Sequence, residues 1–364
     1  MNNKVSKIQI GMFLVLIMCS LYLGLSDIIL LRKSGNEVLI SMIVGSLIGI
    51  IPVLMYLKIN SHLEALNIYE KNKVMFGKII GNIINVLMII IYIIMLVIAL
   101  RAIAVFVTSK YLQNTPFYLV TTLIVITCLI ISFKGLQTLA RVSQICFILS
   151  LIFMIVIEAF LFQYIEIDNI LPIFTNNYIT NIISGAIYHA ATTSLLTMLL
   201  LSISKSQIND PQKYNKTIII FYIIASLILL IVMFFVISCL GYDMAKLFRY
   251  PEYVLLKKIG ISSSELHLEN LLAFRWIFYM LALANISVYG ITCGVKSMIK
   301  NEKLNKIIII IICLVSMFIG KMAFGDIPHS IIMIKKYFVP FIALPIFVLL
   351  TIMFIRVITR KKES

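Results

Sequence analysis

The sequence predicts an all-α polytopic membrane protein with ten transmembrane helices. Two observations carry this prediction: 62% of the 364 residues are hydrophobic while 13% are charged, and the mean hydropathy is +1.08. Soluble domains contain about 45–50% apolar and about 25% charged residues, so this chain has too few polar side chains to cover a fold in water. Because ten spans of ~20 residues leave no room for a large soluble domain, residues 1–364 are expected to form a single membrane domain.

The apolar runs that define the helices are separated by short polar segments. The first run follows Lys4 and Lys7, is longer than the apolar part of a signal peptide, and has no small-residue cleavage site behind it, so we expect it to be retained as a span. The predicted spans are 8–31, 38–57, 79–107, 117–133, 142–162, 182–203, 217–240, 271–295, 307–324 and 337–355.

The distribution of charge predicts the orientation of these spans. Ten spans place both termini on one side, and that side carries 19 of the 31 basic residues but 5 of the 15 acidic ones. Basic residues favour the cytoplasmic side, so both termini are predicted to be cytoplasmic. The net charge of +16 therefore indicates contact with anionic membrane lipid and not with nucleic acid. The six cysteines lie inside apolar segments without a C-x-x-C pair and are interpreted as packing residues.

Two predicted outer loops, 163–181 and 241–270, are longer than simple connectors. The second contains a possible short amphipathic helix at Val254–Ile259. These loops are either caps over an outward-facing cavity or plain connectors. The ten spans divide into a first repeat at about 8–162 and a second at about 182–355, with opposite orientations, an arrangement typical of secondary transporters that bind substrate between the repeats.

Ionisable residues inside spans are candidates for function because they are costly in lipid. We expect Asp27, Glu158 and Arg275 to lie near the outer ends of their spans, where they can reach interfacial water. Arg101 lies deeper. It is expected either to bind a substrate carboxylate or to pair with Glu158 or Asp27.

Two segments combine small and hydroxyl-bearing residues inside spans, Ser20–Ser26 in the first span and Gly185–Ser194 in the sixth. Such residues serve helix packing or mark discontinuous helices whose freed backbone groups bind a ligand. Their matching positions, first in each half, favour a shared site, to which polar residues of the eighth span are added. The candidate ligand-binding residues are Ser20, Gly24, Ser26, Arg101, Gly185, Tyr188, His189, Thr192, Thr193, Ser194, Asn285 and Tyr289.

Catalytic motifs are missing from the sequence. It contains no P-loop, H-E-x-x-H, G-x-S-x-G or dinucleotide-binding G-x-G-x-x-G. The four histidines, His62, His189, His267 and His329, do not have metal-ligand spacing. We therefore expect neither an enzyme nor a cofactor or metal.

Several short motifs, in matching order along most of the chain, resemble the B-subunit family of spore germinant receptors. They are Gly77-Lys-Ile-Ile-Gly81, Leu100-Arg-Ala-Ile-Ala104, Leu112-Gln-Asn-Thr-Pro116, Lys134-Gly-Leu-Gln-Thr-Leu-Ala-Arg141, Ile167-Asp-Asn-Ile-Leu-Pro172, and Leu268-Glu-Asn to Tyr289-Gly290. That family is similar to the amino acid–polyamine–organocation transporters. The resemblance implies a LeuT-like 5+5 inverted repeat with helices 1 and 6 broken.

The resemblance also implies a function. It indicates a B subunit in the spore inner membrane, or a bacterial cell membrane, that binds a small germinant such as an amino acid and assembles with A-type and lipoprotein C-type subunits. Arg101 matches the family's arginine in helix 3. The chain lacks the family's glycine-rich break in helix 1, and it has Leu195 and Leu196 where helix 6 often has a glutamate, which implies a different germinant or lost binding. The alternatives are a proton-coupled secondary amino acid transporter and a membrane scaffold with an empty site.

Overall fold

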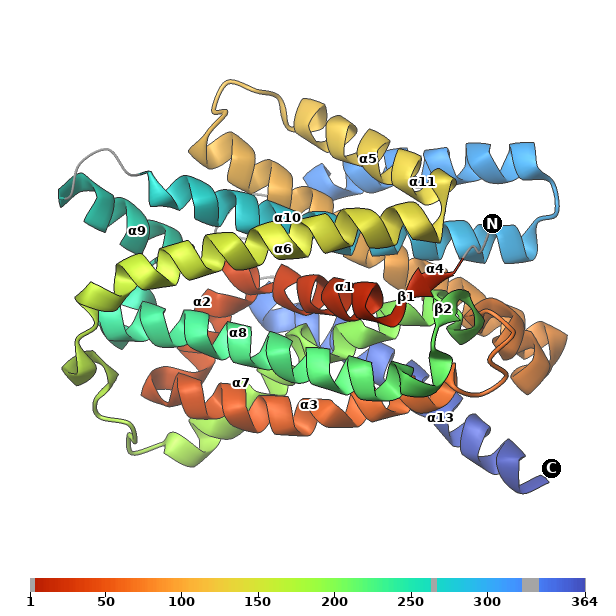
Figure 1. Cartoon of the computed structure of the whole chain (residues 1–364), viewed down its shortest axis with the longest axis horizontal. Helices are drawn as coiled ribbons and strands as arrows, with labels where there is room; N and C mark the ends of the chain where they lie inside the picture. The colour runs from red at the N-terminus through yellow and green to blue at the C-terminus, as the bar shows by residue number, and fades with distance from the viewer. Residues whose placement is uncertain (1–3, 263–266, 323–333, 364) are drawn as a thin grey trace.

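The computed structural model describes residues 4–262, 267–322 and 334–363. Within these ranges, nine helices are long and apolar enough to cross a membrane, and the apolar helix Lys7–Ser20, 14 residues long, precedes them. The helices run side by side along the long axis of the molecule (Figure 1). The prediction of an all-α polytopic membrane protein is confirmed.

The long helices largely follow the predicted apolar runs. Their bounds are α3 (Val38–Asn60), α4 (Ile68–Lys110), α5 (Phe117–Lys134), α6 (Leu136–Leu161), α7 (Tyr178–Thr192), α8 (Pro211–Ala245), α10 (Leu268–Met298), α11 (Glu302–Met322) and α13 (Leu344–Glu363). The shorter helices are α1 (Lys7–Ser20), α2 (Asp27–Ser34) and α9 (Pro251–Ser262). The π-helical turns are η1 (Tyr22–Ser26) and η7 (Val339–Ala343), and the 3-10 segments are η2 (Gly35–Glu37), η3 (Phe162–Tyr164), η4 (Ile167–Ile170), η5 (Ser194–Ser202) and η6 (Lys205–Gln207).

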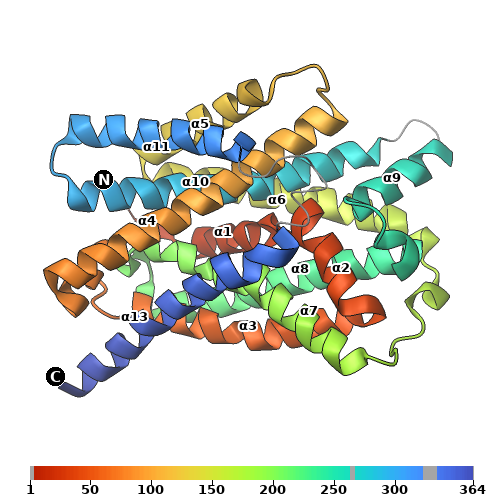
Figure 2. The same ribbon diagram turned by 180° about the vertical axis from the view of Figure 1, so that it is seen from behind.

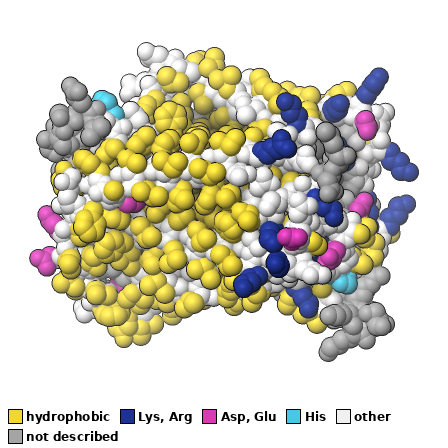
Figure 3. All heavy atoms as spheres, in the orientation of Figure 1, with side chains coloured by type: hydrophobic (Ala, Val, Ile, Leu, Met, Phe, Trp, Pro, Cys, Tyr) yellow, Lys and Arg dark blue, Asp and Glu magenta, His cyan; other side chains and the backbone are white. Residues whose placement is uncertain are grey.

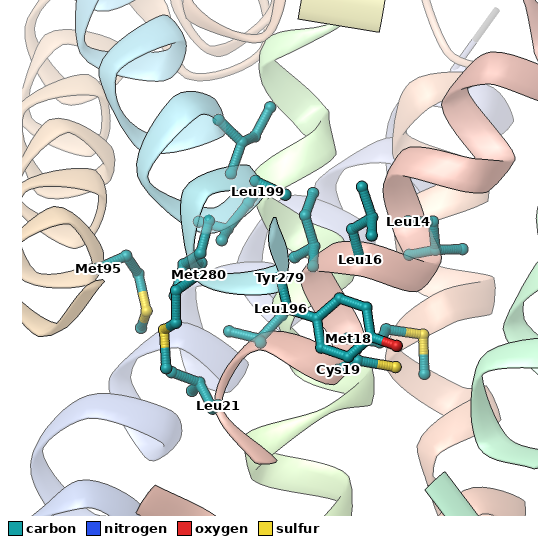
Figure 4. Packing of buried hydrophobic residues seen from close by; sticks show 14 of the residues in the cluster. Leu14, Leu16, Met18, Cys19, Leu21, Met95, Leu196, Leu199, Tyr279 and Met280 are labelled. Carbon is teal, nitrogen blue, oxygen red and sulfur yellow. The ribbon is translucent and has the colours of Figure 1, made fainter. Parts of the chain in front are cut away.

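Helix α1 lies at the centre of the bundle. Every residue from Phe13 to Ser20 is buried, as expected for a helix that is apolar on all sides. Its side chains pack against Met95 of α4, Leu199 of η5 and Met280 of α10 (Figure 4). Its 14 residues are fewer than the ~20 needed to cross a bilayer, and the chain continues from it into η1 and α2.

Helix α4 consists of two parts that meet at Gly77, whose φ of +79° is left-handed. A side chain at Gly81 would collide with the backbone of Asn72 and Lys73, so the short first part packs closely on the second. The ammonium group of Lys71 donates to the carbonyl oxygens of Ile59 and Asn60, at 3.3 and 2.9 Å. This positive charge therefore binds the last carbonyls of α3, at the negative end of the helix dipole.

The loop between α8 and α10 contains α9, and the predicted short helix at Val254–Ile259 is part of it. Gly241, with φ +70°, interrupts the end of α8 and turns the chain toward this loop. Helix α9 packs against both α8 and α10. It therefore covers one end of the bundle and is not a free connector.

Helix α1 begins and α13 ends at the same end of the molecule, apart from each other across the bundle (Figures 1 and 2). Strand β1 (Val5–Ser6) pairs in parallel with β2 (Ile208–Asn209), directly before α8. Lysine and arginine side chains gather at this end, while hydrophobic side chains cover the middle of the visible face (Figure 3). We call it the basic end.

Candidate functional site

The first candidate segment, Ser20–Ser26, is the point where the first helix loses its α-helical form. Helix α1 ends at Ser20, and the backbone N–H of Ser26 donates to Leu21 across the π-helical turn, at 2.9 Å. The hydroxyl of Ser20 donates to the carbonyl of Ile17 at 2.6 Å, and that of Ser26 donates to Tyr22 at 3.4 Å. Gly24 lies within the turn.

The second candidate segment, Gly185–Ser194, contains the end of α7. Thr193 has φ −119° and ψ −72°, and from Ser194 the chain continues as the 3-10 segment η5. The hydroxyls of Thr192 and Thr193 donate to the carbonyls of Tyr188 and His189, at 2.9 and 2.7 Å. Such bonds to the preceding turn compete with the helix ladder and accompany bends in helices.

The structure brings these two interruptions together around a small cavity of about 10 Å³, which we call the interruption cavity. Ser26 lines it from the first interruption, and Tyr188 and Thr192 line it from the second. The rest of the lining is apolar: Leu21, Leu25, Ile98, Ile334 and Phe338. A volume of ~10–15 Å³ holds about one water molecule. The walls of the cavity expose apolar atoms. The hydroxyl of Tyr188 is buried and has no hydrogen-bond partner among the described residues.

His189 and Ser194 contact a different neighbour, helix α3. His189 Nε2 lies 3.3 Å from Ser46 Oγ, the hydroxyl of Tyr222 in α8 donates to the Ser46 carbonyl, and Ser194 Oγ lies 3.0 Å from the same hydroxyl. We call Ser46, His189, Ser194 and Tyr222 the hydroxyl network. Ser46 and Tyr222 were missed by sequence reasoning because neither belongs to a cluster of small and hydroxyl-bearing residues like those at Ser20–Ser26 and Gly185–Ser194.

Glycines allow α7 and η5 to approach their neighbours closely. A side chain at Gly49 of α3 would collide with Ser194 and Tyr222, and one at Gly45 would come within 2.7 Å of the Ala186 carbonyl oxygen. A side chain at Gly185 would collide with Ser34 and Ser41. Gly185 is thus a packing residue of the α7 interface with α2 and α3, which is the first of the two roles that its sequence context left open.

The remaining candidates do not line the interruption cavity. Asn285 and Tyr289 are buried on α10, where Tyr289 lies beside Cys293 and Gln207. Arg101 is half-buried on α4, with its guanidinium 3.4 Å from the Lys321 carbonyl and near the ring of Phe117. The expectation that Arg101 binds a carboxylate stays a prediction.

A buried group of charges lies next to the first interruption. Arg275 of α10, 3% exposed, donates to the carboxylate of Glu252 in α9, and its other terminal nitrogen is 3.7 Å from a carboxylate oxygen of Glu158 in α6. We call these three residues the ion triad. Beside it lies another cavity of about 10 Å³, lined by Tyr22 of η1 and by Cys19, Glu252, Arg275 and Trp276.

The ion triad corrects the expectation that Glu158 and Arg275 reach interfacial water. Both are buried within the protein because α9 covers this end of the bundle and supplies the second carboxylate. Asp27, the third residue with that expectation, is also buried, at the start of α2. Glu252 was missed because it lies in a loop. Most acidic residues lie on the side of the predicted outer loops. This surplus could have indicated that a loop carboxylate pairs with a basic residue of a span.

Metal and disulfide sites are absent from the parts of the chain that the structure describes. No group of three or more His, Cys, Asp or Glu side chains is arranged to hold a metal ion there. His329 lies outside the described residues. All six cysteines are free, in agreement with their interpretation as packing residues.

Comparison with known proteins gives the family. A search of curated proteins finds no match. The family model described as spore germination protein matches residues 5–325, a range that includes both interruptions, the hydroxyl network and the ion triad. The chain therefore belongs to the spore germination protein family, whose members are permease-like membrane proteins.

Proposed function

We propose that the chain is the membrane-embedded B subunit of a spore germinant receptor and that it binds a small germinant, an amino acid, at the interruption cavity. The observation that carries the proposal is the meeting of two interrupted helices at Ser26, Tyr188 and Thr192. Interrupted helices leave backbone groups and half-helix dipoles that bind the charged ends of an amino acid. The unpartnered Tyr188 hydroxyl adds a neutral hydrogen-bonding group.

The size of the cavity suggests how binding is coupled to a response. A space of about 10 Å³ is too small for an amino acid, so the ligand has to stabilise a more open arrangement of α1, α2, α7 and η5. A ligand shifts an equilibrium by its difference in affinity for the two states. We propose that the helices form a LeuT-like 5+5 inverted repeat of ten spans and that this opening alters the surface presented to partner subunits.

The proposed setting is the spore inner membrane, with both termini cytoplasmic. This orientation is supported by the basic end (Figure 3), since basic residues favour the cytoplasmic side. The proposed partners are an A-type subunit and a lipoprotein C-type subunit. Copurification of the full chain with each of these subunits tests the assembly.

Ligand binding is tested with the full chain in lipid nanodiscs and each of the common amino acids in radiolabelled form. Trp276, the only tryptophan, lines the other cavity, the one beside the ion triad, together with Tyr22 of η1. Its fluorescence therefore provides a second readout of changes near the first interruption. We expect saturable binding of at least one amino acid. Thr192→Val removes one hydroxyl from the interruption cavity and is expected to weaken binding about tenfold, the effect of losing one hydrogen bond to a charged group.

The matched control is Thr217→Val, because Thr217 also donates to its own helix but lies partly exposed on α8, outside the interruption cavity. Equal affinity of the wild type and the Thr192→Val and Tyr188→Phe variants would place the ligand elsewhere. Accumulation of the bound amino acid inside proteoliposomes that contain this chain alone would contradict a pure receptor and favour the transporter.

A further inference from the structure

A groove lies on the outside of the bundle where α3, α7 and the start of α13 meet. It has a volume of about 210 Å³ and lies between Ile48 and Pro52 of α3, Ala190 and Ala191 of α7, and Ala343 and Phe347 at the junction of η7 and α13. Every side chain that lines it is apolar. We call it the α3–α13 groove.

The groove exists because three neighbouring segments depart from regular α-helix beside it. Pro52 lies inside α3, where it cannot donate to the carbonyl of Ile48. Helix α7 ends at Thr192, one residue beyond Ala191, and η7 is a π-helical turn that contains Pro340. The side chains of Ala190, Ala191 and Ala343 are too short to fill the space between the helices.

The occupant of the groove has to be apolar and slender. The rim residues Ile51, Ile187 and Leu344 are each at least half exposed, on helices of membrane-crossing length. Water in such a space would lose hydrogen bonds that no lining side chain replaces. A second helix, about 10–12 Å across with its side chains, is too wide to enter a space of this volume. An acyl chain has the right width.

Charge indicates which lipid supplies this chain. Helices α3 and α13 both run toward the basic end (Figures 1 and 2). The exposed Lys58 follows Pro52 by about 9 Å along α3, from the helical rise, and lies two helical turns after Ile51, on the same side of α3 as the groove. Arg356 of α13 is turned toward α4 instead, where its Nε donates to the Met75 carbonyl at 2.9 Å. Basic side chains at the cytoplasmic ends of transmembrane helices attract anionic headgroups. We propose that the α3–α13 groove holds an acyl chain of an anionic phospholipid whose headgroup lies beside Lys58 at the basic end.

This site adjoins the second interruption. Ala191 and Leu195 border the groove and flank Thr192, which lines the interruption cavity. An acyl chain in the groove would therefore contact the segment where α7 changes into η5. The lipid site does not depend on which ligand the interruption cavity binds.

The test uses the full chain purified in detergent and native mass spectrometry with added phosphatidylglycerol or phosphatidylcholine. We expect at least one phosphatidylglycerol to be retained more strongly than phosphatidylcholine. Lys58→Gln changes no buried contact and is expected to reduce phosphatidylglycerol binding about fivefold, the effect of one basic side chain at an anionic surface. Ala190→Phe fills the groove and is expected to reduce retention of phosphatidylglycerol further.

The control is Ile155→Phe on α6, where the side chain is 60% exposed and lies outside the groove, so retention should not change. A photoreactive group on the acyl chain of phosphatidylglycerol is expected to label residues of α7 or α13. Equal retention of both lipids, insensitive to Lys58→Gln and Ala190→Phe, would overturn the proposal. Cross-links that join two copies of the chain through the groove would also overturn it, because the groove would then be a protein interface.

Discussion

The ion triad and the hydroxyl network are both buried polar clusters between helices, but they differ in what the loss of one member leaves behind. In the ion triad, two carboxylates share one guanidinium, so removal of Arg275 leaves like charges facing each other without a counter-charge. In the hydroxyl network, each member is uncharged or can turn to another partner, as Ser194 can turn to Thr193 at 3.5 Å.

This difference separates a fixed region from one that can adjust. Breaking a buried ion pair by removing one partner costs about 3–5 kcal/mol, whereas a neutral hydrogen bond contributes about 0.5–1.5 kcal/mol. The ion triad fixes α9 to α6 and α10, next to the first interruption. The hydroxyl network lies beside the second interruption, and its weaker bonds can exchange when α7 and η5 move.

The largest expected effect is that of Arg275→Met. It should lower the free energy of unfolding by about 3–5 kcal/mol, because Glu158 and Glu252 remain buried without their cation. Thermal unfolding of the purified chain, followed by the fluorescence of Trp276, measures the loss. The triple variant Arg275→Met, Glu158→Gln, Glu252→Gln should recover most of it. A single variant as stable as the wild type would show that the triad does not fix α9.

Gly49→Ala tests the close approach of α3 to η5. The added methyl group would collide with Ser194 and Tyr222, so we expect a loss of about 1–3 kcal/mol, measured by the same unfolding experiment. Gly320→Ala is the matched control, because its methyl group would meet neighbours at an ordinary 3.6 Å. Equal stability of the two variants would contradict tight packing around the hydroxyl network.

Tyr222→Phe sharpens the comparison by removing one hydroxyl without changing the packing. The hydroxyl bonds both Ser46 and Ser194, and its loss should cost about 1 kcal/mol in chemical or thermal unfolding. That is several-fold less than the effect of Arg275→Met. A loss as large as that of Arg275→Met would mean that the hydroxyl network is as rigid as the ion triad.

The smallest effect is expected for the ion pair between Lys7 and Asp210 at the basic end, which is exposed to water. The hydrogen bond from Lys7 lowers the pKa of Asp210 below its ordinary value. The ion pair therefore contributes its full stabilisation at pH values above the ordinary pKa of an aspartate. This contribution is lost as the pH falls through the lowered pKa that Asp210 has in the folded protein. Melting temperatures of the wild type and Asp210→Asn between pH 3 and pH 7 should converge at the acid end. A constant difference across that range would contradict this assignment.

The sequence was sufficient to predict the helices but not the contacts between distant segments. Apolar runs predicted the spans because lipid demands long apolar helices. Gly77 explains why the long second part of α4 begins at Lys78, one residue before the predicted start of the third span at 79. For Ser20–Ser26 and Gly185–Ser194 the sequence left helix packing and an interrupted helix open, and the structure shows a change of helix type in both segments. In contrast, depth along a span does not reveal whether a side chain meets lipid or protein. Arg275 therefore seemed able to reach water, although its partner Glu252 comes from a separate loop helix.

The pairing of β1 with β2 has a consequence for measuring motion in this molecule. It joins the residues just before α1 to the residues just after η5 and η6, so both interrupted helices are anchored to one another at the basic end. We expect relative displacement of the two to be smallest at that anchor and larger at the far end of the bundle. Spectroscopic labels flanking Val5 and Ile208 would then serve as a reference pair for distances measured at the opposite end.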